Sequence, residues 1–139
     1  MTEDNKLRNI AAEVSHSDEA LAAARHLHAG GFHRDAVSRS YYAAYHLARA
    51  LLLSEDQQPR THSGTTRMLG LHFIRPGILP SRYSRLLSLL QSEREGADYE
   101  SAFDFGEEDA LRWLSEVESF GQDVKSELRR RGYLPALPS

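Results

Sequence analysis

Cysteine is absent from this sequence of 139 residues, proline occurs only 5 times, and there is no long apolar run. Without cysteine the chain has no disulfide framework, no thiolate zinc site and no cysteine nucleophile. Nothing indicates an oxidising compartment, so we expect a cytoplasmic protein. No stretch approaches the roughly 18 apolar residues of a membrane-spanning helix, so we expect no membrane association. The formal net charge of −3 argues against general binding of polyanions by the whole surface.

Helix-forming residues dominate, and no segment alternates between apolar and polar residues with the period of two that a strand requires. Glycine, proline and polar clusters divide the chain into expected helices at about 2–29, 32–54 and 61–74, a fourth from 81 that fades somewhere between 99 and 104, and a fifth from about 106–107 to 131. Short links between long amphipathic helices place neighbours antiparallel, which predicts an all-α fold, an antiparallel bundle of four to five helices. The length fits one domain, here residues 1–131, followed by a flexible proline-rich tail at 132–139.

The second expected helix has two different faces. The side that we interpret as the core-facing stripe holds Val37, Tyr41, Ala44, Ala48 and Leu51. The other side holds Asp35, Arg39, Tyr42, His46, Arg49 and Leu53. Arginine can hold a phosphate through two hydrogen bonds and histidine can move a proton near neutral pH, so this face indicates a nucleotide or RNA site. An ordinary solvated face, or a dimer interface rich in tyrosine and arginine, explains the same residues.

A charged pair interrupts the apolar stripe of the fourth expected helix. Arg94 and Asp98 lie on the same side of a helical wheel as Leu87 and Leu90. A charge at such a position costs free energy unless it is paired, and a spacing of four residues permits these two to pair. The pair is either a buried ion pair that fixes helix register or a groove-lining pair that positions a phosphate or a partner group.

Histidines supply the remaining candidates. His62 follows Thr61, a residue type that caps helices, so an imidazole and unpaired backbone N–H groups meet where the third helix begins. This indicates either an anion site or simply a capped helix start. His26 and His28 stand two residues apart on a helix and therefore point in different directions, so we expect no metal site there.

Four segments occur together in this chain. They are a Ser-Arg-x-Tyr-Tyr-Ala run at 38–43, the tetrapeptide Thr61-His62-Ser63-Gly64, the pair Phe73-Ile74, and an Arg-x-x-x-Asp-Tyr run at 94–99. In this order the segments resemble the HEPN family, in particular its small prokaryotic branch, over about residues 5 to 128. The resemblance implies a helical bundle that is commonly a homodimer.

The resemblance also implies a chemistry. Many HEPN proteins are RNases, or toxins paired with a minimal nucleotidyltransferase. Their usual catalytic motif is an arginine followed four to six residues later by a histidine, near the start of a late helix. Here Arg94 matches the arginine, and Asp98 stands near the position of the histidine. In related pairs the transferase adds AMP to a tyrosine beside this motif, and Tyr99 is the matching acceptor.

Three functions are open at this point. The first is a component of a toxin–antitoxin pair with a minimal nucleotidyltransferase. The second, favoured by Asp98 in place of histidine, is a non-catalytic nucleotide-binding or scaffold module. The third is a metal-independent RNase. The candidate catalytic residues are Arg94, Asp98, His62 and His46, the candidate nucleotide or AMP-acceptor face is Arg39, Tyr42 and Tyr99, and no metal or other cofactor is expected.

Overall fold

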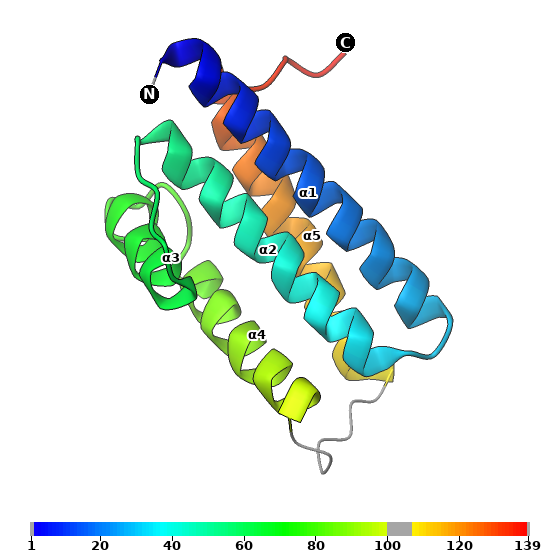
Figure 1. Ribbon diagram of the computed structural model, residues 1–139. Helices are drawn as coiled ribbons and strands as arrows, with labels where there is room; N and C mark the ends of the chain where they lie inside the picture. The colour runs from blue at the N-terminus through cyan, green and yellow to red at the C-terminus, as the bar shows by residue number, and fades with distance from the viewer. Residues whose placement is uncertain (1, 100–106, 139) are drawn as a thin grey trace.

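The computed structural model describes the backbone of residues 2–99 and 107–138, with the side chains of this part except those of 95–99. Within these residues the regular elements are α1 (Glu3–Ala29), α2 (His33–Ser54), α3 (His62–Leu69), the π-helical turn η1 (Gly70–Ile74), α4 (Arg82–Tyr99) and α5 (Glu107–Arg130). The helices α1, α2, α4 and α5 run alternately up and down, and α3 lies beside one end of α2 and α4 (Figure 1). The prediction of an all-α antiparallel bundle is confirmed.

Local signals explain where α1 begins and ends and where α3 begins. The Thr2 hydroxyl accepts the N–H of Asn5 at 3.2 Å, and the Thr61 hydroxyl accepts the N–H of Gly64 at 2.9 Å. The helix α1 stops before Gly31, whose φ of 85° is a left-handed conformation that glycine adopts without steric cost. These signals are local in sequence, so the boundaries of α1 and α2 and the start of α3 lie within a residue or two of the prediction. The α-helix α3 ends at Leu69, five residues before the predicted end, and the rest of the predicted segment is the π-helical turn η1.

The helix α2 is central, with α1, α4 and α5 around it (Figure 1). Its buried residues are Ala36, Val37, Ser40, Tyr41, Ala43, Ala44, Leu47, Ala48, Ala50, Leu51, Leu52, Leu53 and Ser54. Leu53, which the sequence placed on the polar face, is only 4% exposed. The polar face is therefore narrower than predicted, because α2 is covered on more sides than a surface helix. Truncating a fully buried side chain such as Leu51 to alanine costs about 2–5 kcal/mol.

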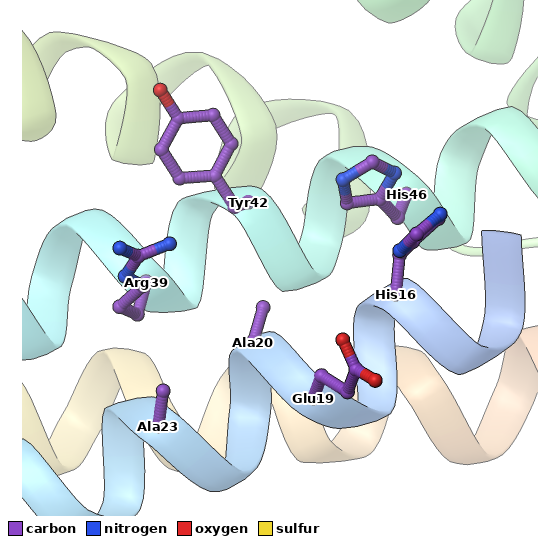
Figure 2. Close-up of a pocket in the computed structure, with 7 residues that line it drawn as sticks. All are labelled: His16, Glu19, Ala20, Ala23, Arg39, Tyr42 and His46. Carbon is purple, nitrogen blue, oxygen red and sulfur yellow. The ribbon is translucent and has the colours of Figure 1, made fainter.

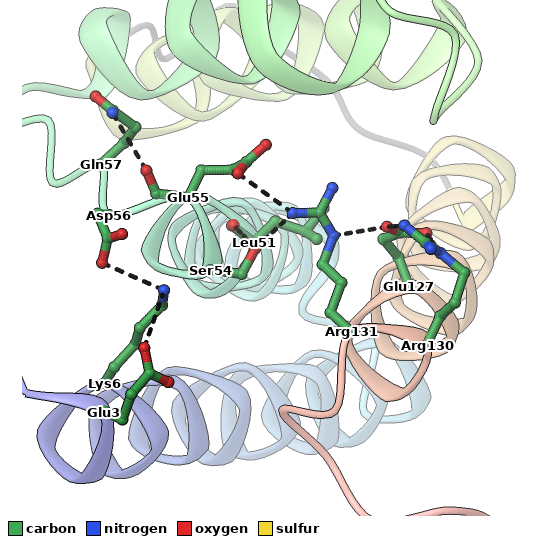
Figure 3. A network of polar contacts seen from close by, with 10 residues as sticks. All are labelled: Glu3, Lys6, Leu51, Ser54, Glu55, Asp56, Gln57, Glu127, Arg130 and Arg131. Atoms are coloured by element: carbon green, nitrogen blue, oxygen red, sulfur yellow. Dashed lines mark hydrogen bonds and ion pairs between the residues drawn. The ribbon is translucent and has the colours of Figure 1, made fainter.

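Ion pairs join both ends of the chain to the turn after α2 (Figure 3). The side chain of Lys6 is 6% exposed, and its Nζ lies 3.3 Å from Asp56. Arg131 lies 3.5 Å from Glu55 and 2.6 Å from Glu127. We call these five residues the end network. It connects α1, the turn after α2 and the end of α5, where both termini of the chain lie (Figure 1).

The first residues of the predicted tail pack against the bundle. Tyr133 and Leu134 are partly buried against the core, and the Tyr133 ring lies 5.0 Å from the Lys6 ammonium. The division into a domain at 1–131 and a tail at 132–139 stays a prediction. In the described parts of the chain, no helix combines the length and the apolar character that crossing a membrane requires.

Candidate functional site

Side chains from α1 and α2 line a hollow between these two helices (Figure 2). The hollow has a volume of about 380 Å³ and is lined by His16, Glu19, Ala20, Ala23, Arg39, Tyr42 and His46. Arg39, Tyr42 and His46 come from α2 at helical spacing, so they share one face of that helix. The small side chains of Ala20 and Ala23 on α1 leave the space open.

A second hollow, of about 350 Å³, lies between α2 and α4. It is lined by Leu27, Asp35, Ser38, Arg39, Tyr42 and Arg94. Arg39 and Tyr42 line both hollows, so the two adjoin along α2. We call the two hollows together the α2 groove. It brings three of the predicted site residues, Arg39, Tyr42 and Arg94, into one place.

Arg94 crosses from α4 to α2. Its Nη2 donates a hydrogen bond to the Tyr42 hydroxyl at 2.7 Å. Its guanidinium lies 4.9 Å from the centre of the Tyr42 ring and 5.7 Å from that of Tyr41. A cation over an aromatic ring contributes about 0.5–2 kcal/mol, so these rings hold the guanidinium in place at the wall of the groove.

Arg39 is more exposed than Arg94. It is exposed, and within the described residues its guanidinium has no hydrogen-bond or ion-pair partner. The carboxylate of Asp35, one helical turn earlier, lines the same hollow and partly offsets the positive charge. The groove therefore offers an anion one guanidinium held by aromatic rings and one that is exposed, and arginine is the side chain that best matches a phosphate.

His46 is held by α1 at the other end of the groove. Its Nδ1 lies 2.6 Å from Oε2 of Glu13, and the other carboxylate oxygen accepts a hydrogen bond from Arg49 Nε at 3.1 Å. Burial raises the pKa of the Glu13 carboxyl, but the hydrogen bonds from His46 and Arg49 outweigh it and leave this pKa below its usual value. Glu13 is thus ionised at neutral pH. The His16 ring centre lies 5.3 Å from that of His46.

His62 lies outside both hollows, in an aromatic stack. Its ring is nearly parallel to that of Tyr45 at 4.4 Å and to that of Tyr41 at 5.5 Å. The Tyr41 hydroxyl makes a hydrogen bond with Nδ1 of His62. His62 is therefore connected to Arg94 through Tyr41, whereas His46 reaches the groove directly.

Asp98 and Tyr99 form the end of α4. Their side chains lie outside the described residues, so the pairing of Arg94 with Asp98 stays a prediction. At a rise of about 1.5 Å per residue, the Tyr99 backbone is about 8 Å further along the helix axis than Arg94.

The model of the HEPN domain matches residues 13–127 of this chain, which is most of its length. The chain belongs to the HEPN family. A protein of Methanocaldococcus jannaschii named "Putative toxin MJ0605" is 36% identical to it over 86% of this chain and 89% of that relative. A second protein of this organism, "Putative toxin MJ0142", is 27% identical over 91% of this chain and 86% of the relative. "UPF0332 protein PH1297" of Pyrococcus horikoshii is 38% identical over 61% of this chain and 60% of the relative.

The sequence alone missed several residues that line or support the α2 groove of this HEPN protein. Glu13 and His16 stand three apart on the polar side of α1, where charged residues are common and carry no signal of their own. Tyr41 was assigned to the core and is indeed buried, but it also links Arg94 to His62. These roles depend on contacts between residues 21 to 33 positions apart, or further, which a single sequence does not reveal.

Proposed function

We propose that this HEPN protein is the toxin component of a toxin–antitoxin pair and that its α2 groove binds the phosphates of single-stranded RNA. The presence of Arg39, Arg94 and Tyr42 in the lining of one hollow carries the proposal. Relatives named as toxins match this chain over most of both lengths, which supports the toxin role. The family resemblance supports RNA as the ligand.

The shape of the groove favours a strand over an isolated small ligand. Its two hollows adjoin through Arg39 and Tyr42 and extend from α1 across α2 to α4. Proteins that hold single strands combine positive charge along the backbone path with aromatic rings that stack on bases. The groove has both features locally, with Tyr42 as the ring. The net charge of −3 makes binding elsewhere on the surface unfavourable.

RNA binding by the purified protein tests this proposal. We expect a fluorescein-labelled single-stranded RNA to bind with an anisotropy change, and Arg39→Ala and Arg94→Ala to weaken binding about tenfold each, as the loss of one phosphate contact implies. Arg85→Ala is the matched control, because Arg85 is exposed on α4 and lines neither hollow. Equal affinity of all four proteins would contradict the proposal.

Growth after induced expression tests the toxin role. Arrest by the wild type, relieved by Arg94→Ala at equal protein level, is the expected result. The loss of arrest must coincide with loss of RNA binding, since the proposal assigns both to one groove. Normal growth of cells that contain the folded wild-type protein would oppose the toxin role while leaving RNA binding to be judged separately.

The partner that fits the family resemblance is a minimal nucleotidyltransferase acting as antitoxin, with Tyr99 as the AMP acceptor. The backbone of Tyr99 lies about 8 Å along the helix axis from that of Arg94, so an added AMP would bring negative charge to this end of α4 and oppose the approach of RNA. Mass spectrometry of the protein after incubation with the transferase and ATP tests this. Modification that survives in Tyr99→Phe would exclude Tyr99 as the acceptor.

The alternative is a non-catalytic module, and one observation favours it. Arg94 is already bound to Tyr42 within the fold, as expected of a residue that holds helices together. The same RNA titration decides between the two functions. If Arg94 is purely structural, Arg94→Ala lowers the stability of the protein without lowering the RNA affinity of the folded molecules.

The homodimer also stays a proposal. Leu89 of α4 and Leu111 of α5 are half-exposed apolar side chains that suit an interface between two copies. Light scattering of the purified protein measures its molar mass and therefore its oligomeric state.

A further inference from the structure

The charge of this chain is unevenly distributed along its sequence. Residues 57–92 contain five arginines and neither aspartate nor glutamate, so their formal charge is +5. The whole chain has 17 lysines and arginines and 20 acidic residues, so the other 103 residues carry 12 cations and 20 anions, a formal charge of −8. Residues 57–92 include α3, η1 and the first part of α4, which together occupy one side of α2 (Figure 1). We call this segment the basic lobe.

The arginines of the basic lobe are exposed and lack carboxylate partners among the described residues. They are Arg60, Arg67, Arg75, Arg82 and Arg85. Arg82 donates to the Tyr83 hydroxyl at 3.0 Å, and that hydroxyl in turn donates to Asp123 of α5. Elsewhere in the chain, by contrast, Arg49 and Arg131 lie against glutamates. The cations of the basic lobe are therefore left for an anion from outside the fold.

A hollow of about 430 Å³ lies between α3 and α4 within the basic lobe. It is lined by Ser63, Thr66, Arg67, Gly70, Ser84, Ser88 and Gln91, so none of its described lining residues carries a carboxylate. Ser84 and Ser88 stand one turn apart on α4, and within the described residues their hydroxyls make no hydrogen bond. A guanidinium and two hydroxyls are donors that a carboxylate or a phosphate accepts from.

The exposed side chains near this hollow fit a protein better than a nucleic acid. Proteins that bind single-stranded RNA present aromatic rings on which bases stack. The rings of Phe73 and Tyr83 in the basic lobe are instead buried, at 0% and 1% exposure. The large apolar side chains exposed around η1 are aliphatic, namely Leu71 at 46% and Ile78 at 37%. Aliphatic side chains among arginines match an acidic protein segment that also carries apolar residues.

The charge distribution also argues against a second copy of this chain as the occupant. In a symmetric dimer, the commonest homo-oligomer, the same surface of both copies meets. Two basic lobes would then bring +5 against +5 and repel each other. A head-to-tail contact could use the acidic first turn of α5, at Glu107, Glu108 and Asp109, but such contacts continue into rings or filaments. A different protein is the simpler partner.

We propose that the basic lobe is the docking surface for an acidic segment of a different protein, and that Arg67, Ser84 and Ser88 bind one carboxylate of that segment in the hollow. Aliphatic side chains of the same segment contact Leu71 and Ile78. The inference does not rest on RNA binding, because the hollow of the basic lobe and the α2 groove have no lining residue in common.

Peptide selection on the immobilised full-length protein tests this proposal, with a phage-displayed library of random peptides as the probe. We expect the selected peptides to be rich in aspartate and glutamate and to contain aliphatic residues. One selected peptide, labelled with fluorescein, is then titrated by anisotropy. Arg67→Glu should weaken its binding by about tenfold or more, and Ser88→Ala by about threefold.

Arg8→Glu is the matched control for these titrations. It makes the same change of charge as Arg67→Glu, at an exposed position of α1 that lines none of the hollows described above. Peptide affinity of this control should stay within a factor of about two, because exposed charges at a distance are screened by salt. Melting curves confirm that each variant is folded, as the exposure of Arg67 and Ser88 predicts.

A reciprocal substitution identifies the bound carboxylate. Each acidic residue of the peptide is replaced in turn by lysine. We expect one replacement to abolish binding to the wild type and to restore binding to Arg67→Glu, because the cation and the anion have then exchanged places. Restoration at none of the positions would contradict a direct contact with Arg67.

The remaining outcomes separate this inference from its rivals. Selected peptides without an excess of acidic residues, equal peptide affinity of Arg67→Glu and the wild type, or an equal loss in Arg8→Glu would each overturn it. RNA affinity that falls in Arg67→Glu but not in Arg8→Glu would assign the hollow to RNA instead. Large assemblies of the wild type that Arg67→Glu abolishes, measured by light scattering, would assign it to self-association. Absence of RNA binding by the wild type overturns only the proposed function.

Discussion

Two regions of this HEPN protein use arginine for different purposes. In the end network, Arg131 is 16% exposed and lies against Glu127 and Glu55, so its charge is neutralised inside the fold. In the α2 groove, Arg39 is exposed without a partner in the described residues, and Arg94 contacts rings and a hydroxyl. A cation that carboxylates already surround holds helices together. The exposed guanidinium of Arg39 keeps its attraction for an external anion.

The first prediction concerns the end network, where the largest change in stability is expected. Arg131→Ala leaves the carboxylates of Glu127 and Glu55 without their common cation and removes packing on the Phe73 ring, 5.0 Å away. Breaking a partly buried ion pair from one side costs about 3 kcal/mol. Urea unfolding measures this, and RNA affinity must stay unchanged. Arg112→Ala, which loses an exposed ion pair with Asp109 at 3.9 Å and a ring contact with Trp113 at 4.7 Å, is the control and should lower stability by about 1 kcal/mol or less.

The second prediction is an acid dependence of the same region. Hydrogen bonds from Arg130 and Arg131, against partial burial, hold the pKa of Glu127 at about 2. The unfolded chain, with its ordinary glutamate pKa near 4.5, binds this proton first, so the stability from Glu127 is present above about pH 4.5 and is lost as pH falls toward 2. Glu127→Gln should cost about 2 kcal/mol at pH 7 and flatten that part of the stability–pH curve. A curve of unchanged slope in the variant would show that other carboxylates dominate.

The third prediction is that substitution of Arg94 lowers both the stability of the fold and the affinity for RNA. Arg94→Ala removes the hydrogen bond to Tyr42 and two ring contacts, so stability should fall by about 1–2 kcal/mol as well as RNA affinity by about tenfold. Arg94→Lys restores the charge without the planar contact and should recover part of the affinity only. Thermal unfolding and anisotropy on the same samples measure the two effects. An Arg94→Ala variant that melts as the wild type does would remove Arg94 from the structural group.

The smallest change in stability is expected at Arg39. Arg39→Ala removes an exposed side chain that makes no recorded polar contact, so the free energy of unfolding should change by less than about 0.5 kcal/mol. RNA affinity should still fall about tenfold, and the plot of the logarithm of affinity against the logarithm of salt concentration should lose about one unit of slope. Titrations of RNA at several salt concentrations measure this slope. A loss of stability equal to that of Arg94→Ala would mean that the two regions do not differ as described.

The sequence predicted the helices well because their signals are local. Thr2, Thr61 and the Gly30–Gly31 pair act within a few residues, and the structure places helix ends there. The width of the polar face of α2 was not predictable in this way. Leu53 is buried because α2 is surrounded by other helices, and helix spacing on one segment does not contain that information.

The candidate site was predicted only in part for the same reason. The shared face of Arg39, Tyr42 and His46 follows from their spacing on one helix. The contact of Arg94 with Tyr42 joins positions 52 apart, and that of His46 with Glu13 joins positions 33 apart. Both depend on how α1 and α4 dock on α2. The functional roles of Arg94, Asp98, His62, His46, Arg39, Tyr42 and Tyr99 stay proposals.

The link between α1 and α2 also sets the order in which the parts of the groove are synthesised. Gly31, with a φ of 85°, lets the chain turn back, so Glu13, His16 and His46 all belong to one helical hairpin near the start of the chain. Arg94 lies on α4 and is translated only after α3. A partner that requires both arginines therefore binds only chains whose synthesis has passed α4.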